Sequence, residues 1–462
     1  MARLVIVSNR TAAPRERGAK AGGLEVGLRE ALSREGGLWF GWSGELAEEP
    51  SPAPKLQQVG NVCFATIDLT PQDHADHYAR YANAALWPLC HYRLGLIDFS
   101  RSSFEGYLRV NRLFAERLAP LLRPDDIVWV HDYHFFTVAA SLRALGVRNP
   151  LGFFLHIPFP APEVLTALPR HRRLIGDLCE FDLIGFQTDR DTLAFRSYIE
   201  REAGGTVAAD GTFAAFGRRG RVGDFPIGID TAGFVRMAEA AATSVQTRRL
   251  RESLGDRRLV IGVDRLDYSK GLPQRLEAYH TMLERYGEHR GRTTYMQIAP
   301  ISRGEVEEYR NLRRELEGAV GRINGRFAEF DWSPVRYLNK AFPRQALAGF
   351  YRSAAVGLVT PLRDGMNLVA KEYVAAQNPA DPGVLVLSRF AGASRALPQA
   401  LTVNPYDTEE IADAMHVALT MSLEDRRGRW EGMMEELRHN TVRRWCDSFV
   451  QSLSAAGAIS AA

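Results

Sequence analysis

The sequence lacks long apolar runs, paired cysteines and a strong net charge, and each absence excludes a class of protein. No apolar stretch approaches the roughly 18 residues of a membrane-spanning helix, so we expect no contact with a membrane. The four cysteines (Cys63, Cys90, Cys179 and Cys446) are scattered without a C-x-x-C pair, which is typical of reduced packing residues in a cytoplasmic protein. The formal net charge is only +3, so nothing predicts a nucleic-acid partner.

The composition is that of a globular protein with more than one domain. Of its 462 residues, 45% are hydrophobic and 24% are charged, and a chain of this length exceeds one ordinary core. The first ten residues, M-A-R-L-V-I-V-S-N-R, contain one short apolar run. We interpret that run as a first strand and not as a signal peptide.

Short apolar runs alternate with helical patterns in two series along the chain. Such alternation predicts an α/β fold with parallel, doubly wound sheets. The first series comprises Leu4–Ser8, Ile127–His131, Leu151–His156 and Leu183–Thr188. The second comprises Leu259–Val263, Thr294–Ile298, Ala355–Val359, Val384–Leu387 and Leu401–Val403.

The segment Asp224–Asp230 separates the two series, and we interpret it as a linker. We therefore expect an N-terminal domain at residues 1–226 and a C-terminal domain at residues 227–440. A final helix and tail at residues 441–462 should pack back towards the N-terminal domain. Two such domains facing each other would leave a cleft between the carboxyl ends of their strands, where ligands usually bind.

The most informative motif is T-P-L-R-D-G-M-N-L-V-A-K-E-Y-V-A-A at residues 360–376. It leads from a buried strand through a sharp turn into a helix, whose first N–H groups and dipole favour an anion. Asp364 in the turn can bind sugar hydroxyls and Glu372 in the helix can bind a ribose diol, while the amides between them hold a diphosphate. Taken alone, the two carboxylates are more typical of an N-cap and of a residue that complements the helix dipole.

Basic residues and glycines follow several other strands. Arg265 and Lys270 in V-D-R-L-D-Y-S-K-G-L can neutralise a diphosphate leaving group, although a solvated basic pair fits this segment equally well. Arg303 can bind phosphate oxygens as a fork, or it can belong to a capping box formed by Ser302 and Glu305. Arg10 ends the first strand, and the later Gly22-Gly23 pair fits either a phosphate-binding turn or a plain loop.

Two further patterns resemble metal sites and are better explained otherwise. His131 and His134 lie three apart at a strand end, but no third ligand is apparent nearby. Asp189 and Asp191 form an Asp-x-Asp that opens a helix, so N-capping explains it better. His156 also ends a strand and is more suited to sugar hydroxyls than to nucleophilic catalysis. We therefore expect neither a metal ion nor a cofactor.

Together, six motifs resemble those of the bacterial trehalose-6-phosphate synthase family, which are retaining glycosyltransferases. They are G-G-L-W-F-G-W-S-G-E, L-W-P-L-C-H-Y-R, W-V-H-D-Y-H, F-F-L-H-I-P-F-P, R-L-D-Y-S-K-G-L and L-R-D-G-M-N-L-V-A-K-E-Y. The resemblance runs from Ser8 to Asp407 and into the C-terminal helices. It implies a GT-B fold, in which two Rossmann-like domains face each other across a cleft.

The resemblance also implies a reaction and a set of site residues. The family moves glucose from UDP-glucose to glucose 6-phosphate and forms α,α-trehalose 6-phosphate. The residues implied to bind the acceptor are Arg10, Tyr78, Trp87, Asp132, Arg303 and Arg344, with Trp87 and Ile157 selecting its anomer. Those implied to bind the donor are Gly22, Gly23, Arg265, Lys270, Phe342, Leu368, Val369, Ala370, Lys371 and Glu372. Those implied to be catalytic are Asp364, His156, Arg265 and Lys270.

The resemblance further implies a mechanism and an assembly state. No carboxylate in the motifs is placed as a covalent nucleophile, and the family is thought to react by same-face attack, in which the departing phosphate takes the acceptor proton. The enzyme then stabilises an oxocarbenium-like centre and a growing diphosphate charge. The partners expected are the two small-molecule substrates and further copies of the chain, in a tetramer.

Two other functions compete with this interpretation. One is a sister synthase with another acceptor, such as a glucosylglycerol-phosphate synthase or a pseudo-glycosyltransferase that joins cyclitols. The other is a non-catalytic sugar-phosphate sensor, which we expect to have lost Asp364, Arg265 or Lys270. The chain retains all three and has the full acceptor set, so we favour glucose 6-phosphate as acceptor.

The motifs predict that transfer does not need a divalent metal. Arg265, Lys270 and helix amides supply the positive charge that a metal would otherwise bring to the diphosphate. We expect the initial rate to be unchanged after dialysis against EDTA and after addition of Mg²⁺ or Mn²⁺. Loss of turnover in EDTA, restored by either ion, would contradict this prediction.

Overall fold

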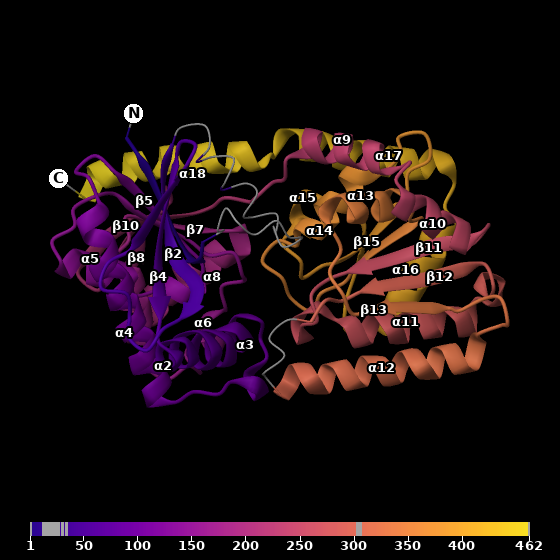
Figure 1. Ribbon diagram of the computed structural model, residues 1–462, viewed down its shortest axis with the longest axis horizontal. Helices are drawn as coiled ribbons and strands as arrows, with labels where there is room; N and C mark the ends of the chain where they lie inside the picture. Colours follow the sequence, from indigo (N-terminus) through magenta and orange to yellow (C-terminus); the bar gives the residue numbers. More distant parts are fainter. Residues whose placement is uncertain (1, 12–27, 29–31, 33–35, 302–306, 461–462) are drawn as a thin grey trace. The chain divides into compact units, whose positions relative to one another are not determined.

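The computed structural model describes residues 2–11, 28, 32, 36–301 and 307–460. Contacts between residues divide the chain into two compact units (Figure 1). Unit 1 takes the described residues up to Pro226 and those from Arg443 onward, and unit 2 runs from Ile227 to Val442. The change of unit after Pro226 falls within the segment that the sequence marks as a linker.

In the described part of unit 1, ten strands form one sheet in the order β3-β4-β2-β1-β5-β6-β7-β10-β9-β8. Neighbours from β4 to β10 are parallel, whereas β3, β9 and β8 pair antiparallel with theirs. The strands are β1 (Leu4–Arg10), β2 (Gly37–Leu46), β3 (Lys55–Val59), β4 (Val62–Leu69), β5 (Ile127–His131), β6 (Leu151–Phe154), β7 (Leu183–Phe186), β8 (Thr206–Val207), β9 (Thr212–Ala215) and β10 (Arg218–Asp224).

The helices of unit 1 connect these strands. They are α2 (Pro71–His74), the π-helix η1 (Ala75–Leu86), α3 (Trp87–Cys90), η2 (Leu94–Leu96), α4 (Arg101–Leu118), η3 (Ala119–Leu121), η4 (Tyr133–Phe135), α5 (Val138–Ala144), α6 (Pro162–Leu165), α7 (His171–Leu178), α8 (Asp189–Arg201) and, from the end of the chain, α18 (Val442–Ser460). The chain builds β1, β2 and β4 outward in one direction, then returns to add β5, β6 and β7 in the other. The switch therefore lies between β1 and β5, where doubly wound sheets bind ligands.

The C-terminal helix α18 packs against the sheet of unit 1. The ring of Phe449 stacks on Trp129 of β5, with centroids 4.4 Å apart. A Cβ at Gly152 or Gly185 would come within 2.8 Å of that phenylalanine ring, so both strands carry glycine where the ring lies. Trp129 and Phe449 have no solvent-exposed surface. The C-terminal helix α18 therefore contributes to the hydrophobic core of unit 1.

In the described part of unit 2, six parallel strands form a sheet in the order β13-β12-β11-β14-β15-β16. This is the strand order of a Rossmann fold, whose switch point lies between β11 and β14. The strands are β11 (Arg258–Val263), β12 (Thr293–Ile298), β13 (Val335–Leu338), β14 (Val356–Val359), β15 (Val384–Ser388) and β16 (Leu401–Val403).

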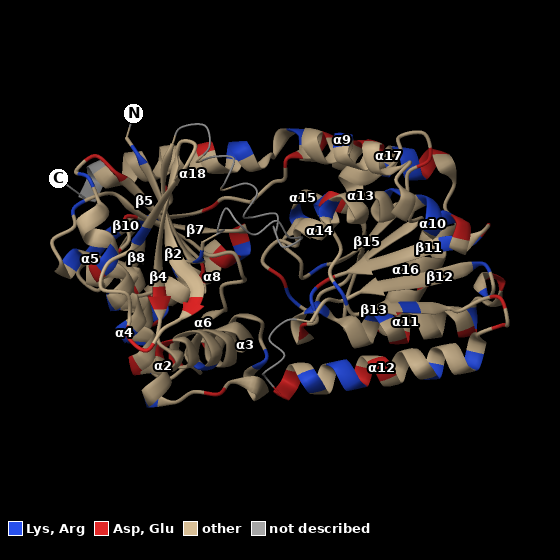
Figure 2. Cartoon of the chain, in the orientation of Figure 1, with Lys and Arg blue, Asp and Glu red and all other residues tan. Residues whose placement is uncertain are grey.

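The helices of unit 2 cover its sheet and shield one core. They are α9 (Thr231–Ala241), α10 (Val245–Leu254), η5 (Tyr268–Lys270), α11 (Leu272–Arg285), η6 (Gly287–His289), α12 (Glu307–Phe327), α13 (Arg344–Arg352), α14 (Leu368–Ala376), α15 (Ala393–Ala396), α16 (Thr408–Thr420) and α17 (Leu423–His439). Apolar side chains of α11 and α16 meet those of the strands in this core. The long helix α12 contributes Leu312, Leu316 and Ile323 to this core. Basic and acidic residues alternate along its length, as Figure 2 shows.

The strands expected from the sequence are present, with ends that differ by one or two residues. The strand expected at Leu151–His156 stops at Phe154, and the one expected at Leu183–Thr188 stops at Phe186. The strands β2, β3, β4, β8, β9, β10 and β13 were not expected. Across the described part of the chain, no helix combines the length and apolarity that crossing a membrane requires.

Candidate active site

Three polar side chains meet at the switch point of unit 2. Lys270 follows β11 and its ammonium group donates to Oδ2 of Asp364, which follows β14. Asn367 Nδ2 donates to the same oxygen at 3.0 Å. Lys270 and Asp364 are 94 residues apart in the sequence. They lie close together because β11 and β14 are parallel neighbours in the sheet.

The backbone around this cluster needs residues that tolerate a left-handed conformation. Gly271 has φ +66°, and a Cβ there would lie 2.4 Å from the carbonyl oxygen of Thr360. Asn367 has φ 72° and is the residue just before α14, a conformation that asparagine adopts more readily than most residues. The two loops therefore approach closely, and Leu362 N donates to Ser269 O across them at 2.8 Å.

A fully buried arginine, which our sequence interpretation missed, lies beneath this cluster. Arg275 from the first turn of α11 forms an ion pair with Asp264 at 2.7 Å. The same guanidinium donates to Lys270 O at 3.0 Å and to Thr360 Oγ1 at 3.1 Å. It thus joins the end of β11, the loop that carries Lys270 and the residue after β14. In the sequence, Arg275 resembles any arginine on a helix face, so only its burial identifies it.

Arg265 lies on the same loop and is held by a second buried carboxylate. Its guanidinium contacts Asp267 Oδ2 at 3.3 Å. Asp267 has no exposed surface and accepts from the backbone N of Ser269 at 3.0 Å. Arg265 is nearly half exposed. Arg265 and Lys270 therefore occupy one short, hydrogen-bonded loop, as the sequence predicts.

The helix α14 carries a buried carboxylate that is already paired. Glu372 Oε1 accepts from Arg344 Nη2 at 3.0 Å and Nε at 3.2 Å. Burial raises the pKa of Glu372, and Arg344 opposes that shift. Arg344 begins α13 and also lies over the ring of Phe234 at 5.0 Å. The family resemblance implies that Arg344 binds the acceptor and that Glu372 binds the donor. In the structure, the two side chains contact each other within unit 2.

The other residues of α14 that are implied to bind the donor differ in which of their groups are available to a ligand. Leu368, Val369 and Ala370 form its first turn, where backbone N–H groups lack helical acceptors. The side chain of Lys371 is buried and donates to Ile227 O at 2.6 Å, so only its main chain can serve a ligand. Burial lowers the pKa of Lys371 to about 8.

In unit 1, Arg10 lies at the end of β1 beside an aromatic row. Its guanidinium lies over the ring of Trp42 at 6.0 Å, and Gly44 leaves space for it. His74 contacts both Trp42 and Tyr78, with ring centroids 4.9 Å and 5.2 Å apart. Tyr78 lies on the π-helix η1, a rare helix type that is frequent at functional sites.

Asp132 follows β5 at the switch point of unit 1 and has the strained φ of 76°. Its Oδ1 accepts from the backbone N of His156 at 3.2 Å. His156 Nε2 in turn lies 3.0 Å from His131 Nδ1. Burial lowers the pKa of His156 to about 3, and it also lowers the pKa of His131. Both rings are therefore neutral at physiological pH and can exchange hydrogen bonds with hydroxyls.

Trp87 and Ile157, implied to select the acceptor anomer, are both buried in unit 1. Trp87 packs against His91 at 4.1 Å and against Tyr133 at 5.6 Å. Phe342 lies just before α13 in unit 2, where it packs on Phe350. Gly22, Gly23 and Arg303, and with them the capping box Ser302–Glu305, lie outside the described residues.

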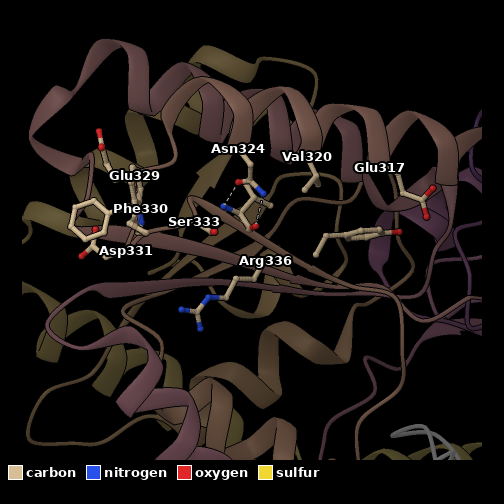
Figure 3. A pocket seen from close by; sticks show the side chains of 11 residues that line it. Glu317, Val320, Asn324, Glu329, Phe330, Asp331, Ser333 and Arg336 are labelled. Atoms are coloured by element: carbon tan, nitrogen blue, oxygen red, sulfur yellow. Dashed lines mark hydrogen bonds between the residues drawn. The ribbon is translucent and has the colours of Figure 1, made fainter.

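A pocket of about 620 Å³ in unit 2 does not contain any of these residues. It lies between α12 and β13, and Figure 3 shows its walls. There Asn324 accepts from Val335 N at 2.9 Å and donates to Val335 O at 3.0 Å (Figure 3). The site predicted from sequence is elsewhere, at the carboxyl ends of β11 and β14.

The Asp-x-Asp of unit 1 opens α8, as predicted, but neither aspartate is the N-cap residue. Thr188 is the N-cap of α8 and accepts from Asp191 N, while its hydroxyl donates to Asp191 Oδ2 at 2.6 Å. Asp191 Oδ1 accepts from Phe159 N at 2.9 Å. Asp191 is buried and Asp189 is exposed, so the pair does not present two carboxylates to one ion.

Comparison with known proteins assigns this geometry to a family. Residues 3–455 match the profile of Glycosyltransferase family 20. The chain belongs to glycosyltransferase family 20. A curated trehalose-6-phosphate synthase of Sinorhizobium fredii is 52% identical to it over 458 residues, which is 98% of this chain and 99% of that protein.

Solved structures of family 20 members agree with the fold. A UDP-forming α,α-trehalose-phosphate synthase of Burkholderia xenovorans in complex with glucose-6-phosphate matches with a TM-score of 0.95 and 50% identity, covering 98% of this chain and 100% of the other. An E. coli relative bound with UDP-2-fluoro glucose matches with a TM-score of 0.94 and 48% identity, covering 98% and 99%. The two Rossmann-like units are those of a GT-B glycosyltransferase, as the sequence predicts.

The structure predicts that Asp191 stabilises unit 1 and has no direct part in transfer. We expect Asp191→Ala to lower the free energy of unfolding by about 1–3 kcal/mol, because a buried carboxylate that accepts two hydrogen bonds is lost. Chemical denaturation measures the change, with Asp189→Ala as the exposed control. A large loss of turnover in folded Asp191→Ala, restored by raised Mn²⁺, would instead identify a metal ligand.

Proposed function

We propose that this family 20 glycosyltransferase moves glucose from UDP-glucose to glucose 6-phosphate, giving α,α-trehalose 6-phosphate and UDP with retention at the anomeric carbon. The observation that carries the proposal is the cluster of Arg265, Lys270 and Asp364 at one switch point in a family 20 chain. The relatives that are about half identical and bind glucose-6-phosphate or UDP-2-fluoro glucose support the choice of both substrates.

Unit 2, from residue 227 onward, is proposed to be the nucleotide-sugar-binding domain. Arg265 and Lys270 neutralise the diphosphate, and the first amides of α14 add hydrogen bonds to it. Glu372 binds the ribose diol. Phe342 and the undescribed pair Gly22-Gly23 complete the donor set. Lys270 forms an ion pair with Asp364, so the donor diphosphate competes with this carboxylate for the ammonium group.

Unit 1, up to residue 226, is proposed to be the acceptor-binding domain, with the helix at 441–462 as part of it. Arg10, together with Arg303, binds the phosphate of glucose 6-phosphate, while Tyr78 and Asp132 hold the sugar. Trp87 and Ile157 limit the pocket to one anomer. The aromatic neighbours of Tyr78 and the neutral imidazole of His156 suit a sugar ring, because they offer apolar contact and hydrogen bonds.

Arg344 is better placed in the donor set than in the acceptor set. Its fork holds Glu372 Oε1 through two nitrogens, which leaves the other carboxylate oxygen for a ribose hydroxyl. The paired arginine also opposes the effect of burial, which raises the pKa of Glu372. We therefore propose that Arg344 positions Glu372.

In the proposed reaction, the bond between the glucose anomeric carbon and the β-phosphate oxygen breaks, and a bond to the acceptor hydroxyl forms on the same face. The acceptor proton passes to the departing phosphate. Arg265 and Lys270 stabilise the charge that grows on the diphosphate, and Asp364 binds the ring that gains positive character. His156 is neutral, so it contributes hydrogen bonds to glucose and not a proton.

The assembly and location of the protein rest on the family resemblance. We propose that the chain forms a homo-oligomer, a tetramer, and that it acts in the cytoplasm. All four cysteines are thiols, which fits a reducing compartment.

The proposed reaction is tested by its product. Purified protein incubated with glucose 6-phosphate and a panel of nucleotide-glucoses should yield α,α-trehalose 6-phosphate, identified by NMR, fastest with UDP-glucose. Glycerol 3-phosphate and cyclitol phosphates serve as competing acceptors. A product other than trehalose 6-phosphate would support a sister synthase, and binding without turnover would support a sensor.

The two carboxylates of the donor site should have separable roles. Glu372 binds a part of the donor that does not change, so Glu372→Gln should raise the donor KM about tenfold to a hundredfold with little change in kcat. Asp364 binds the ring that gains charge, so Asp364→Asn should mainly lower kcat. Steady-state kinetics measures both, with the exposed Asp331→Asn as control.

Calorimetry with UDP checks the assignment independently of turnover. Asp364→Asn should still bind UDP, because the uridine and diphosphate contacts remain. If Asp364→Asn abolished UDP binding while Glu372→Gln preserved it, the two ends of the donor would be assigned in reverse.

A further inference from the structure

Two histidines and a glutamate converge in unit 2, outside the proposed active site. Glu288 and His289 lie on η6, the turn between α11 and β12, and His416 lies on α16. One ligand atom from each residue lies within 4.8 Å of those of the other two. His289 Nε2 is 3.0 Å from His416 Nδ1, and Glu288 Oε1 is 3.6 Å from the same nitrogen.

These separations match the spacing of ligands around a small divalent ion. Zinc binds imidazole nitrogen and carboxylate oxygen at about 2.0–2.2 Å, so a tetrahedral centre holds neighbouring ligand atoms about 3.3 Å apart. The two separations from His416 Nδ1 lie on either side of that value, and all three ligand atoms lie within 4.8 Å of one another. The side chains of Glu288 and His416 are partly exposed.

The scaffold under the three residues is rigid. The ring of Tyr286 stacks on His416 with centroids 3.9 Å apart and planes at 8°, and its hydroxyl donates to Asp413 at 2.8 Å. His289 is buried, and its carbonyl accepts from Thr293 Oγ1 at 3.1 Å. Met282 of α11 and Met415 of α16 belong to one core, so α16, which carries His416, packs on the helix that precedes η6.

The electrostatic state of the site also suits a metal. Burial is the main cause of a lowered pKa at His289, with His416 and Arg258 acting in the same direction and Glu288 opposing them. A lowered pKa favours the neutral imidazole, which is the form that binds a metal. Arg258 is the nearby positive charge, and its guanidinium donates to Leu419 O.

We propose that Glu288, His289 and His416 form a binding site for a borderline divalent transition-metal ion such as Zn²⁺. Two imidazoles and one carboxylate favour Zn²⁺ over Mg²⁺ or Ca²⁺, which prefer oxygen ligands. Solvent supplies the fourth ligand, because Glu288 and His416 face water in part.

The site is structural and not catalytic. It adjoins Thr293 and Arg258, which begin β12 and β11, whereas Arg265, Lys270 and Asp364 follow the carboxyl ends of the strands. Six residues of strand separate the two ends, a distance of roughly 20 Å. A bound ion would fasten the turn before β12 to α16 and stabilise unit 2 without touching the substrates.

The test uses the full-length, untagged protein after removal of metals by a chelator. We expect Zn²⁺ to bind in calorimetry at one tight site, Co²⁺ to give the visible absorption of a tetrahedral complex, and Zn²⁺ to raise the Tm of unfolding by about 2–4 °C or more. Mg²⁺ should do none of these. Transfer activity should be the same with and without Zn²⁺.

Three variants decide whether these residues hold the ion. His416→Gln and Glu288→Gln change partly exposed side chains, so they should fold, and each should weaken Zn²⁺ binding about tenfold to a hundredfold or more. His280→Gln is the matched control, because His280 lies 3.8 Å from both Glu277 and Glu284 and also beside Arg326. Its affinity for Zn²⁺ should equal that of the wild type.

Two results would overturn the proposal. One is the absence of saturable Zn²⁺ and Co²⁺ binding by the wild type, which would leave a hydrogen bond between two histidines as the whole role of the pair. The other is unchanged affinity in folded His416→Gln and Glu288→Gln, which would assign the ion to other histidines.

Discussion

The proposed donor site depends on one buried guanidinium. Arg275 is fully enclosed and joins Asp264, Lys270 O and Thr360, each from a different segment. Removing one partner of a buried ion pair lowers the free energy of unfolding by about 3–5 kcal/mol. The contacts of Arg275 therefore stabilise the arrangement of all three segments. The loops that present Lys270 and Asp364 are consequently fixed relative to each other. Reacting groups gain from such fixed positions, because the cost of ordering them is met during folding.

The two units prepare their ligand sites by different physical means. In unit 2, Lys270, Arg265 and Arg344 each contact a carboxylate, so an anion that binds there would compete with these ion pairs. In unit 1, the buried imidazoles of His131 and His156 are neutral because of burial. One site is thus built to exchange ion pairs and the other to exchange hydrogen bonds. On the proposed function, this matches a diphosphate leaving group on one side and a sugar ring on the other.

The sequence predicted those features that local patterns encode. Apolar runs located the central parallel strands, because strands buried on both faces must be apolar throughout. It did not locate β3, whose five residues are all exposed, or β2, in which three glycines interrupt the pattern. Motif order placed Lys270 and Asp364, since both follow strands whose ends meet at a switch point.

Contacts between distant residues could not be predicted in this way. Arg344 and Glu372 are 28 residues apart, and His289 and His416 are 127 apart. Neither pair has a spacing that marks it, because only the packing of one helix or turn on another makes them neighbours. Arg275 shows the same limit, since a helix-face arginine is usually solvated.

The docking of α18 on β5, β6 and β7 has a consequence for how the protein is made. A ribosome releases residues in order, so nearly all of the first sheet exists before the ring of Phe449 that covers Trp129 has been synthesised. Unit 2 is continuous in sequence among its described strands and can complete its core while the chain is still attached. Unit 1 must wait for the last twenty or so residues, with the surface around Gly152 and Gly185 exposed to water or to a chaperone. Unit 1 is therefore the first unit to be synthesised and the last to complete its core.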